Sequence, residues 1–124
     1  MIKFIDISKQ SNRSYVVATP DTHVFFFFNR SGKINIDLRS PGAKAYLFGL
    51  FVGQKQDNFK LTTLQHHSSP NTFSELLIKG VFTDRSRFSY RGLIRIEKAA
   101  QKSHAYQKNQ NLLMSDKGFV ESKP

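Results

Sequence analysis

The sequence predicts an all-β protein, and three observations lead to this prediction. Apolar and polar residues alternate in several segments, which is the period of two expected for a strand with one buried face. Turn-forming residues recur between these segments, as in Thr19-Pro20-Asp21, Ser40-Pro41-Gly42 and Ser68-Ser69-Pro70-Asn71. No segment has the apolar stripe of a crossover helix, which excludes a doubly wound α/β fold and leaves a sandwich, a barrel or a stacked solenoid.

The N-terminal half contains two kinds of predicted strand. Residues 24–28 and 46–48 are apolar at every position, which is typical of strands that are apolar on both faces or that await a partner. Residues 33–38 alternate instead, with Ile34, Ile36 and Leu38 on one face. Both kinds indicate strands, and only the second identifies the buried face.

The C-terminal half continues the alternation. Residues 59–63 and 76–82 alternate, and the longest case runs over residues 87–97, where only Leu93 breaks the pattern. We expect the core to include the inward residues Leu76, Ile78, Phe82, Phe88, Tyr90, Ile94 and Ile96. Gly80 and Gly92 lie within these apolar faces, where a glycine indicates a bend or the close approach of a bulky group.

Two later segments do not alternate. Residues 97–102 lack an apolar stripe and a helix cap, so we predict a loop. An amide cluster then precedes the apolar run 112–114, and such amides commonly form side-chain ladders or turn bonds. The cluster consists of Gln107, Asn109, Gln110 and Asn111.

Composition limits the possible functions. The chain has 124 residues, 39% of them hydrophobic, and a net charge of +10, which suits one globular domain over residues 1–124. It has no cysteine, which removes disulfides, thiolate metal ligands and thiol nucleophiles. The longest apolar run, residues 45–52, is too short to span a membrane, and no signal peptide is apparent, so we expect a cytoplasmic protein.

A concentration of positive charge suggests one alternative function. Arg85, Arg87, Arg91 and Arg95 are predicted to share one strand face, with Lys98, Lys102 and Lys108 following and Glu97 as the single acid among them. Such a row could bind the phosphates of a nucleic acid, or it could be an ordinary solvated face. The neighbouring Phe88 and Tyr90 point to the opposite face, which favours a core role for both rings.

The sequence gives no positive evidence for catalysis. His66 and His67 are adjacent on a predicted strand and therefore point to opposite faces, so they cannot easily bind one metal ion together. Ser74 lies near them without the motif of a nucleophile elbow. A sugar-active β-helix enzyme is disfavoured by the few acids and the lack of an export signal. We therefore expect no enzyme activity.

Residues 59–124 resemble the core of the SufB/SufD family, scaffold components of the SUF iron–sulfur cluster assembly machinery. The resemblance begins with His66 and Ser74 and continues through residues 79–81, 84–86 and 90–92. It is strongest over residues 100–102 and 105–115, and residues 120–124 also fit. The matched residues that we single out are Gly80, Gly92, Gln101, Tyr106, Gln107, Asn109 and Asn111.

The resemblance implies a fold and a set of partners. It implies a right-handed parallel β-helix, in which residues 1–58 are placed by strand pattern alone. The stretch from Tyr106 to Leu113 resembles the SufD branch, because the SufB branch has a cysteine in this neighbourhood. The implied role is a non-catalytic scaffold that pairs with a SufB-like subunit and a SufC-like ABC ATPase, with the cluster handled by the whole complex and no cofactor held in this chain.

The family pattern also continues beyond Pro124, into a metal or cluster region and a helical end that contacts the ATPase. We therefore expect this chain to be the N-terminal part of a longer β-helix, lacking those functional residues. Open coil ends leave strand edges unpaired, so we expect the chain to self-associate through them.

Overall fold

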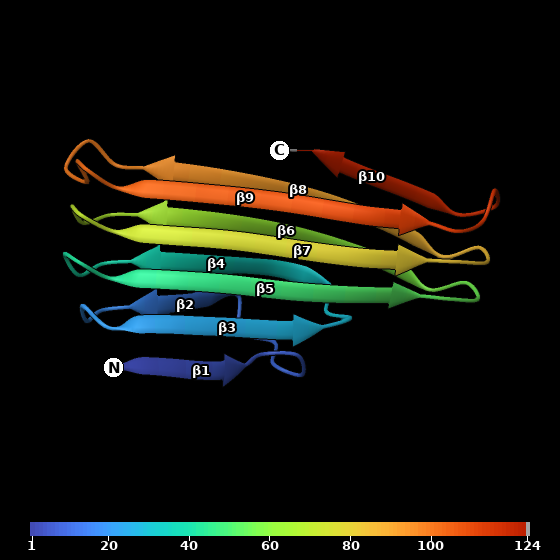
Figure 1. The fold of residues 1–124 in the computed structure, drawn as a ribbon, viewed down its shortest axis with the longest axis horizontal. Helices are drawn as coiled ribbons and strands as arrows, with labels where there is room; N and C mark the ends of the chain where they lie inside the picture. The colour runs from blue at the N-terminus through green and yellow to red at the C-terminus, as the bar shows by residue number, and fades with distance from the viewer. Residues whose placement is uncertain (124) are drawn as a thin grey trace.

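The chain winds as a right-handed coil of ten parallel-paired strands, as the computed structural model shows for residues 1–123 (Figure 1). Successive strands alternate between two sheets. The first contains β1 (Ile2–Asp6), β3 (Thr22–Phe28), β5 (Lys44–Gly53), β7 (Phe73–Phe82) and β9 (His104–Leu113). The second contains β2 (Ser14–Val17), β4 (Gly32–Leu38), β6 (Asn58–His67), β8 (Arg87–Ile96) and β10 (Phe119–Lys123).

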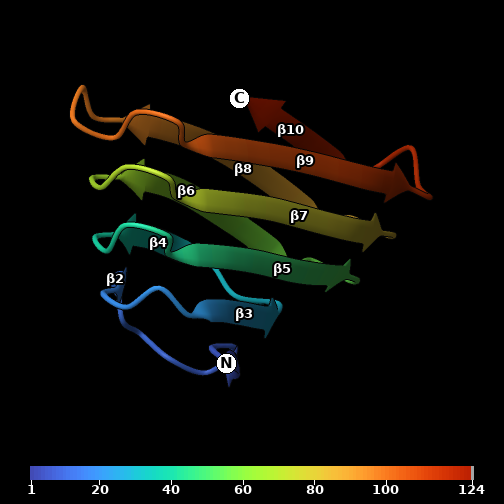
Figure 2. The same cartoon turned by 60° about the vertical axis from the view of Figure 1, so that its left-hand side comes forward.

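The two five-stranded sheets form two layers, the odd-numbered strands in one and the even-numbered strands in the other (Figure 2). We call them sheet A (β1, β3, β5, β7, β9) and sheet B (β2, β4, β6, β8, β10). Every strand pairs in parallel with the strand two positions away in the chain. The prediction of a parallel β-helix is therefore confirmed, and residues 97–102 lie in a loop as expected. Within residues 1–123, no helix could cross a membrane.

The core lies between the two sheets. Alternate residues of each strand point inward, so Ile34, Ile36 and Leu38 of β4 are all buried. Phenylalanines fill the centre, where the ring of Phe88 stacks on Phe82 at 5.1 Å and tilts against Phe51 at 4.4 Å. Aromatic pairs at these spacings add to the free energy of burial. The apolar residues at 24–28 alternate after all: Phe25 and Phe27 are buried, whereas Phe26 and Phe28 are exposed.

Two core predictions are wrong. Ile94 and Ile96 lie on the inward face of β8, yet they are 41% and 46% exposed. Both side chains are exposed because β10, the neighbour of β8 in sheet B, is short and pairs with β8 only along residues 87–91. No described strand covers the end of β8.

The corners of the coil stack as regularly as the strands. Gly42 donates its backbone N–H to Asn71 O, and Asn71 donates in turn to Gln101 O. These corners require a left-handed backbone, since φ is +80° at Gly42, +57° at Asn71 and +61° at Lys102. Near the N-terminus, the buried guanidinium of Arg30 donates to Ile7 O and Tyr15 Oη, which fastens the β1–β2 connection to the coil.

Candidate functional site

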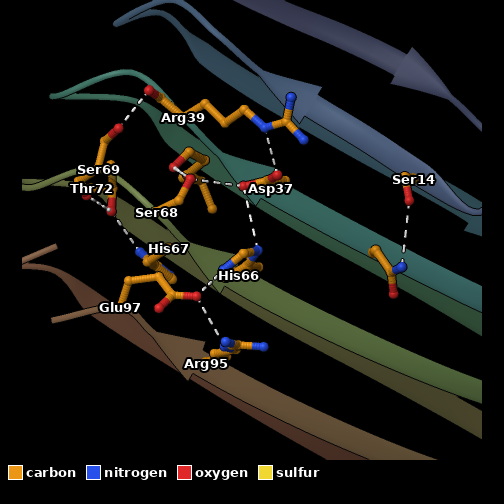
Figure 3. Close-up of polar contacts among 12 residues, drawn as sticks. Ser14, Asp37, Arg39, His66, His67, Ser68, Ser69, Thr72, Arg95 and Glu97 are labelled. Carbon is orange, nitrogen blue, oxygen red and sulfur yellow. Dashed lines mark hydrogen bonds and ion pairs between the residues drawn. The ribbon is translucent and has the colours of Figure 1, made fainter. Parts of the chain in front are cut away.

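A row of charged side chains crosses the outer face of sheet B. Parallel pairing brings Asp37, His66 and Arg95 into register on β4, β6 and β8. His66 Nδ1 lies 3.6 Å from Asp37 Oδ1, and its Nε2 lies 2.9 Å from Glu97 Oε1 (Figure 3). The imidazole therefore sits between two carboxylates from neighbouring coils.

Two arginines complete this row. Arg39 Nε lies 2.7 Å from Asp37 Oδ2, and Arg95 Nε lies 3.0 Å from Glu97 Oε1. The hydrogen bond from His66 and the charge of Arg95 lower the pKa of the Glu97 carboxyl. Asp37 thus lies between Arg39 and His66, and Glu97 lies between His66 and Arg95. These contacts connect the neighbouring strands β4, β6 and β8 at their outer face.

His67 belongs to a different, buried network. It points into the coil, opposite to His66, and is 0% exposed. Only the opposite directions of the two histidines were predicted. Its Nδ1 lies 2.6 Å from Thr72 Oγ1 and its Nε2 lies 2.7 Å from Ser74 Oγ (Figure 3 shows the Thr72 side). Ser74 donates to Gln65 Oε1, so the network reaches from the corner into the core. Burial lowers the pKa of His67 to about 4, with a smaller contribution from His66.

The pairing of Ser74 with His67 has the spacing of a nucleophile and a base, but the surroundings give it a different role. Both side chains are buried, at 2% and 0% exposure, so no substrate reaches the hydroxyl. The third member is the Thr72 hydroxyl, which also lies 2.8 Å from Ser103 Oγ of the next corner. The network therefore satisfies the polar groups of stacked corners.

The amide cluster is split between two faces of β9. Gln107, Asn109 and Asn111 point toward the interior, whereas Gln110 is exposed. The side chains of Asn109 and Asn111 donate to each other, and Asn109 Nδ2 also donates to Ile78 O. These bonds join two amides of the same strand and one backbone carbonyl of β7, and no stacked ladder of amides between coils forms among the described residues. The three inward amides stand in register with Leu76, Ile78 and Gly80 of β7.

The inward glycines make room for these amides. A Cβ at Gly80 would lie 2.7 Å from Asn111 Oδ1 and 2.3 Å from the ring of Phe82. A Cβ at Gly92 would lie 2.5 Å from Gln107 Oε1 and 2.6 Å from Tyr90 Oη. Gly80 and Gly92 thus mark close approaches, as their positions in the sequence indicated.

The other matched residues lie elsewhere. Gln101 occupies the β8–β9 loop, where its Nε2 donates to Lys98 O. Tyr106 lies on the outer face of sheet A, 56% exposed and 5.8 Å from the ring of Phe73. The structure therefore brings together Gly80, Gly92 and the three inward amides, and it leaves these two residues apart.

The arginine row is less uniform than predicted. Arg85 lies in the turn before β8, so only Arg87, Arg91 and Arg95 share the strand face. Arg87 stacks over Phe119 at 4.9 Å and Arg95 is paired with Glu97, whereas Arg91 has neither an ion pair nor a ring contact within residues 1–123. Phe88 and Tyr90 are buried on the opposite face. A platform of aromatic rings for base stacking is thus lacking on this face of β8.

The described residues contain no group of three or more His, Asp or Glu side chains placed to share a metal ion. Their polar networks connect strands, corners and the interior of the last coil. The fold and these networks define a class: a parallel two-sheet β-solenoid whose polar side chains hold coil to coil.

Comparison with known proteins gives the family. The family model described as SUF system FeS cluster assembly, SufBD core domain, matches residues 29–124. The chain belongs to this family, and its core domain indicates a role in SUF iron–sulfur cluster assembly. The match begins directly after β3 and reaches further toward the N-terminus than the motifs visible in the sequence. Neither the curated proteins nor the solved structures include a significant match to this chain.

Proposed function

We propose that this chain is a SufD-like, non-catalytic scaffold component of the SUF system. Its family supports a part in iron–sulfur cluster assembly. The observation that carries the finer proposal is the absence of cysteine from the sequence. Iron–sulfur clusters are held mainly by cysteine thiolates, and sulfur is accepted by thiolates. Without thiolates, these 124 residues contribute architecture and leave sulfur chemistry to the rest of the complex.

The proposed partners are a SufB-like subunit, which supplies cysteine, and a SufC-like ABC ATPase, which supplies ATP hydrolysis. The cluster is the cargo of this complex. In the β9 region the SufB pattern has a cysteine, whereas this chain has the inward amides Gln107, Asn109 and Asn111. Amides offer hydrogen bonds and no soft ligand, which supports the SufD-like assignment. The proposed location of the complex is the cytoplasm.

The test is co-expression of this chain with the SufB-like and SufC-like subunits of the same organism, followed by purification through a tag on this chain. We expect both subunits to co-purify. After anaerobic reconstitution with iron and sulfide, we expect visible iron–sulfur absorption in the complex and none in this chain alone.

A control complex carries a SufB-like subunit whose cysteines are replaced by serine. It should assemble and lose the absorption. A cluster formed by this chain alone would overturn the scaffold proposal, and so would retention of nucleic acid in place of the two subunits.

A further inference from the structure

The outer face of sheet A exposes a continuous apolar surface. Its members come from β3, β5 and β7 and are between 37% and 49% exposed. They pair in register across the sheet: Phe26 with Phe48, Phe28 with Leu50, and Val52 with Val81. We call this surface the apolar face; it consists of Phe26, Phe28, Phe48, Leu50, Val52 and Val81.

The outer face of sheet B is different in kind. Its central strands β4, β6 and β8 present mainly polar residues to solvent, including the row formed by Asp37, His66 and Arg95. A solvated sheet face has this composition, whereas parallel sheets with apolar faces are normally covered by helices. The contrast between two sheets of one coil indicates that the apolar face is a binding surface.

The apolar face is also hollowed. A groove of about 540 Å³ runs over it, with Phe26, Phe28, Phe48, Leu50 and Leu77 among its lining residues. The polar side chains at the groove are Asp6, Ser8 and Lys79. Backbone groups of these strands are already paired within the sheet, so an occupant finds no hydrogen-bond partners for its own backbone there. A helix satisfies its backbone internally and suits such a surface.

Both signs of charge lie around the groove: Asp6 lines it and Glu75 is exposed on the outer face of β7, whereas lysines border it on the β7 and β9 side. Lys79 is paired in register with Leu50, and Lys108 with Leu77, so both lysines border the apolar residues. Lys44 lies on the same outer face. Because each copy of the chain has a net charge of +10, mutual repulsion opposes two copies meeting face to face, and an acidic partner is attracted.

We propose that the apolar face binds an amphipathic α-helix of a partner protein, with an apolar stripe on the sheet and acidic residues beside Lys79 and Lys108. A helix of about four turns is roughly 22 Å long, similar to seven residues of a strand. A helix of this length is therefore long enough to lie over the exposed apolar residues of β3 and β5. This inference concerns a surface of the fold and is independent of the SufD-like assignment.

The test uses two designed helical peptides and the full chain. Both peptides carry the same leucine and phenylalanine stripe, flanked by glutamates in one and by lysines in the other. Fluorescence anisotropy at low ionic strength should show binding of the acidic peptide, with the basic peptide weaker by about tenfold or more. Leu50→Ser should weaken the acidic peptide by a similar factor.

Leu93→Ser is the matched control, because Leu93 is 37% exposed on the outer face of sheet B and Leu50 is 44% exposed on sheet A. It should leave peptide binding unchanged. A second measurement uses the unmodified chain and therefore does not depend on whether a variant folds. Backbone amide NMR shifts caused by the acidic peptide should be confined to β3, β5 and β7.

Three results would overturn the proposal. They are equal affinity for both peptides, shifts located on β4, β6 and β8, and a dimer of this chain that disappears in Leu50→Ser. The last result would make a second copy the occupant of the apolar face. Failure of this test leaves co-purification with SufB-like and SufC-like subunits unaffected.

Discussion

Single residues in this coil are constrained mainly by what the neighbouring coil places against them. Gly92 and Gly80 are conspicuous in the sequence as glycines on apolar faces, and the structure shows why they are small. Side chains of β9 lie where a Cβ would be, Gln107 at Gly92 and Asn111 at Gly80, and the ring of Phe82 also crowds Gly80. The inward amides fit only because residues 80 and 92 are glycines, and the glycines are needed because the amides lie there.

Replacing Gly92 with valine should lower the free energy of unfolding by about 1–3 kcal/mol. The added side chain would meet Gln107 Oε1 and Tyr90 Oη at distances no real contact adopts. Thermal and urea denaturation measure the change. Thr62→Val, on the outer face of β6, introduces the same side chain without crowding and should be near neutral; equal effects of the two substitutions would contradict the packing argument.

Histidine burial should make stability depend on pH. His67 has an ordinary pKa near 6.5 when unfolded and a pKa of about 4 when folded, so between these values the unfolded chain binds more protons. The free energy of unfolding therefore falls as pH falls from 6.5 to 4, by up to about 3 kcal/mol from this residue. Burial lowers the pKa of His23 as well, which adds to the same trend.

The measurement is urea denaturation at pH 7 and near pH 4.5. His67→Gln should reduce the pH dependence, since it removes one titrating group and leaves the contribution of His23. His66→Gln is the control, because the adjacent imidazole lies on the outer face and its replacement leaves His67 in place. A pH dependence as large in His67→Gln as in the unmodified chain would show that His67 is not responsible.

At the scale of the elements, the corners repeat one geometry with different residues. Gly42, Asn71 and Lys102 all have positive φ, and hydrogen bonds connect the corner at Gly42 to that at Asn71, and that at Asn71 to Gln101. Glycine and asparagine tolerate this conformation, whereas lysine is strained in it. The β8–β9 corner is therefore the least favourable of the three.

Lys102→Asn should raise the free energy of unfolding by about 0.5–1 kcal/mol, because asparagine adopts the left-handed conformation at lower cost. Calorimetry or urea denaturation would detect it. Lys98→Asn makes the same chemical change in the same loop, at a residue without positive φ, and should not stabilise. A stabilisation common to both would point to charge removal as the cause.

At the scale of the whole molecule, each sheet of the described coil has an edge strand at either end. Sheet A ends at β9 and sheet B at β10 within residues 1–123, and each of these strands is paired on one side only. Ile96 lies at this end and is 46% exposed. Unpaired edges next to apolar side chains are templates for further pairing, while the charge of +10 opposes contact between copies.

We therefore predict that a protein of these 124 residues self-associates through the edge strands, and that the association increases with ionic strength, as salt screens the repulsion. Sedimentation velocity at low and high salt would measure it. Ile96→Lys should reduce association at high salt, and Leu93→Lys, which changes the outer face of the same strand, should not. Association that is weaker at high salt, or insensitive to Ile96→Lys, would contradict this prediction.

The sequence by itself determined the alternating strands at residues 33–38, 59–63, 76–82 and 87–97, their inward faces and several of the turns, because these follow from a period of two and from local turn chemistry. The inward faces of β3 and β5 and the strand β9 were decided by the structure. The sequence also determined the opposite directions of His66 and His67, and the motifs that identified the family. The exposure of Ile94 and Ile96 was decided by tertiary structure, since burial there depends on the length of β10, far along the chain.

The row of Asp37, His66 and Glu97, the network around His67 and the apolar face were likewise decided by the winding of the coil. The row and the apolar face join residues that are separated in sequence by whole coils, and only the parallel register brings them together. The network around His67 joins residues 65–74 across one corner, and only Ser103 comes from the next coil. Local pattern fixes which way a side chain points, and the stacking of coils fixes what it meets.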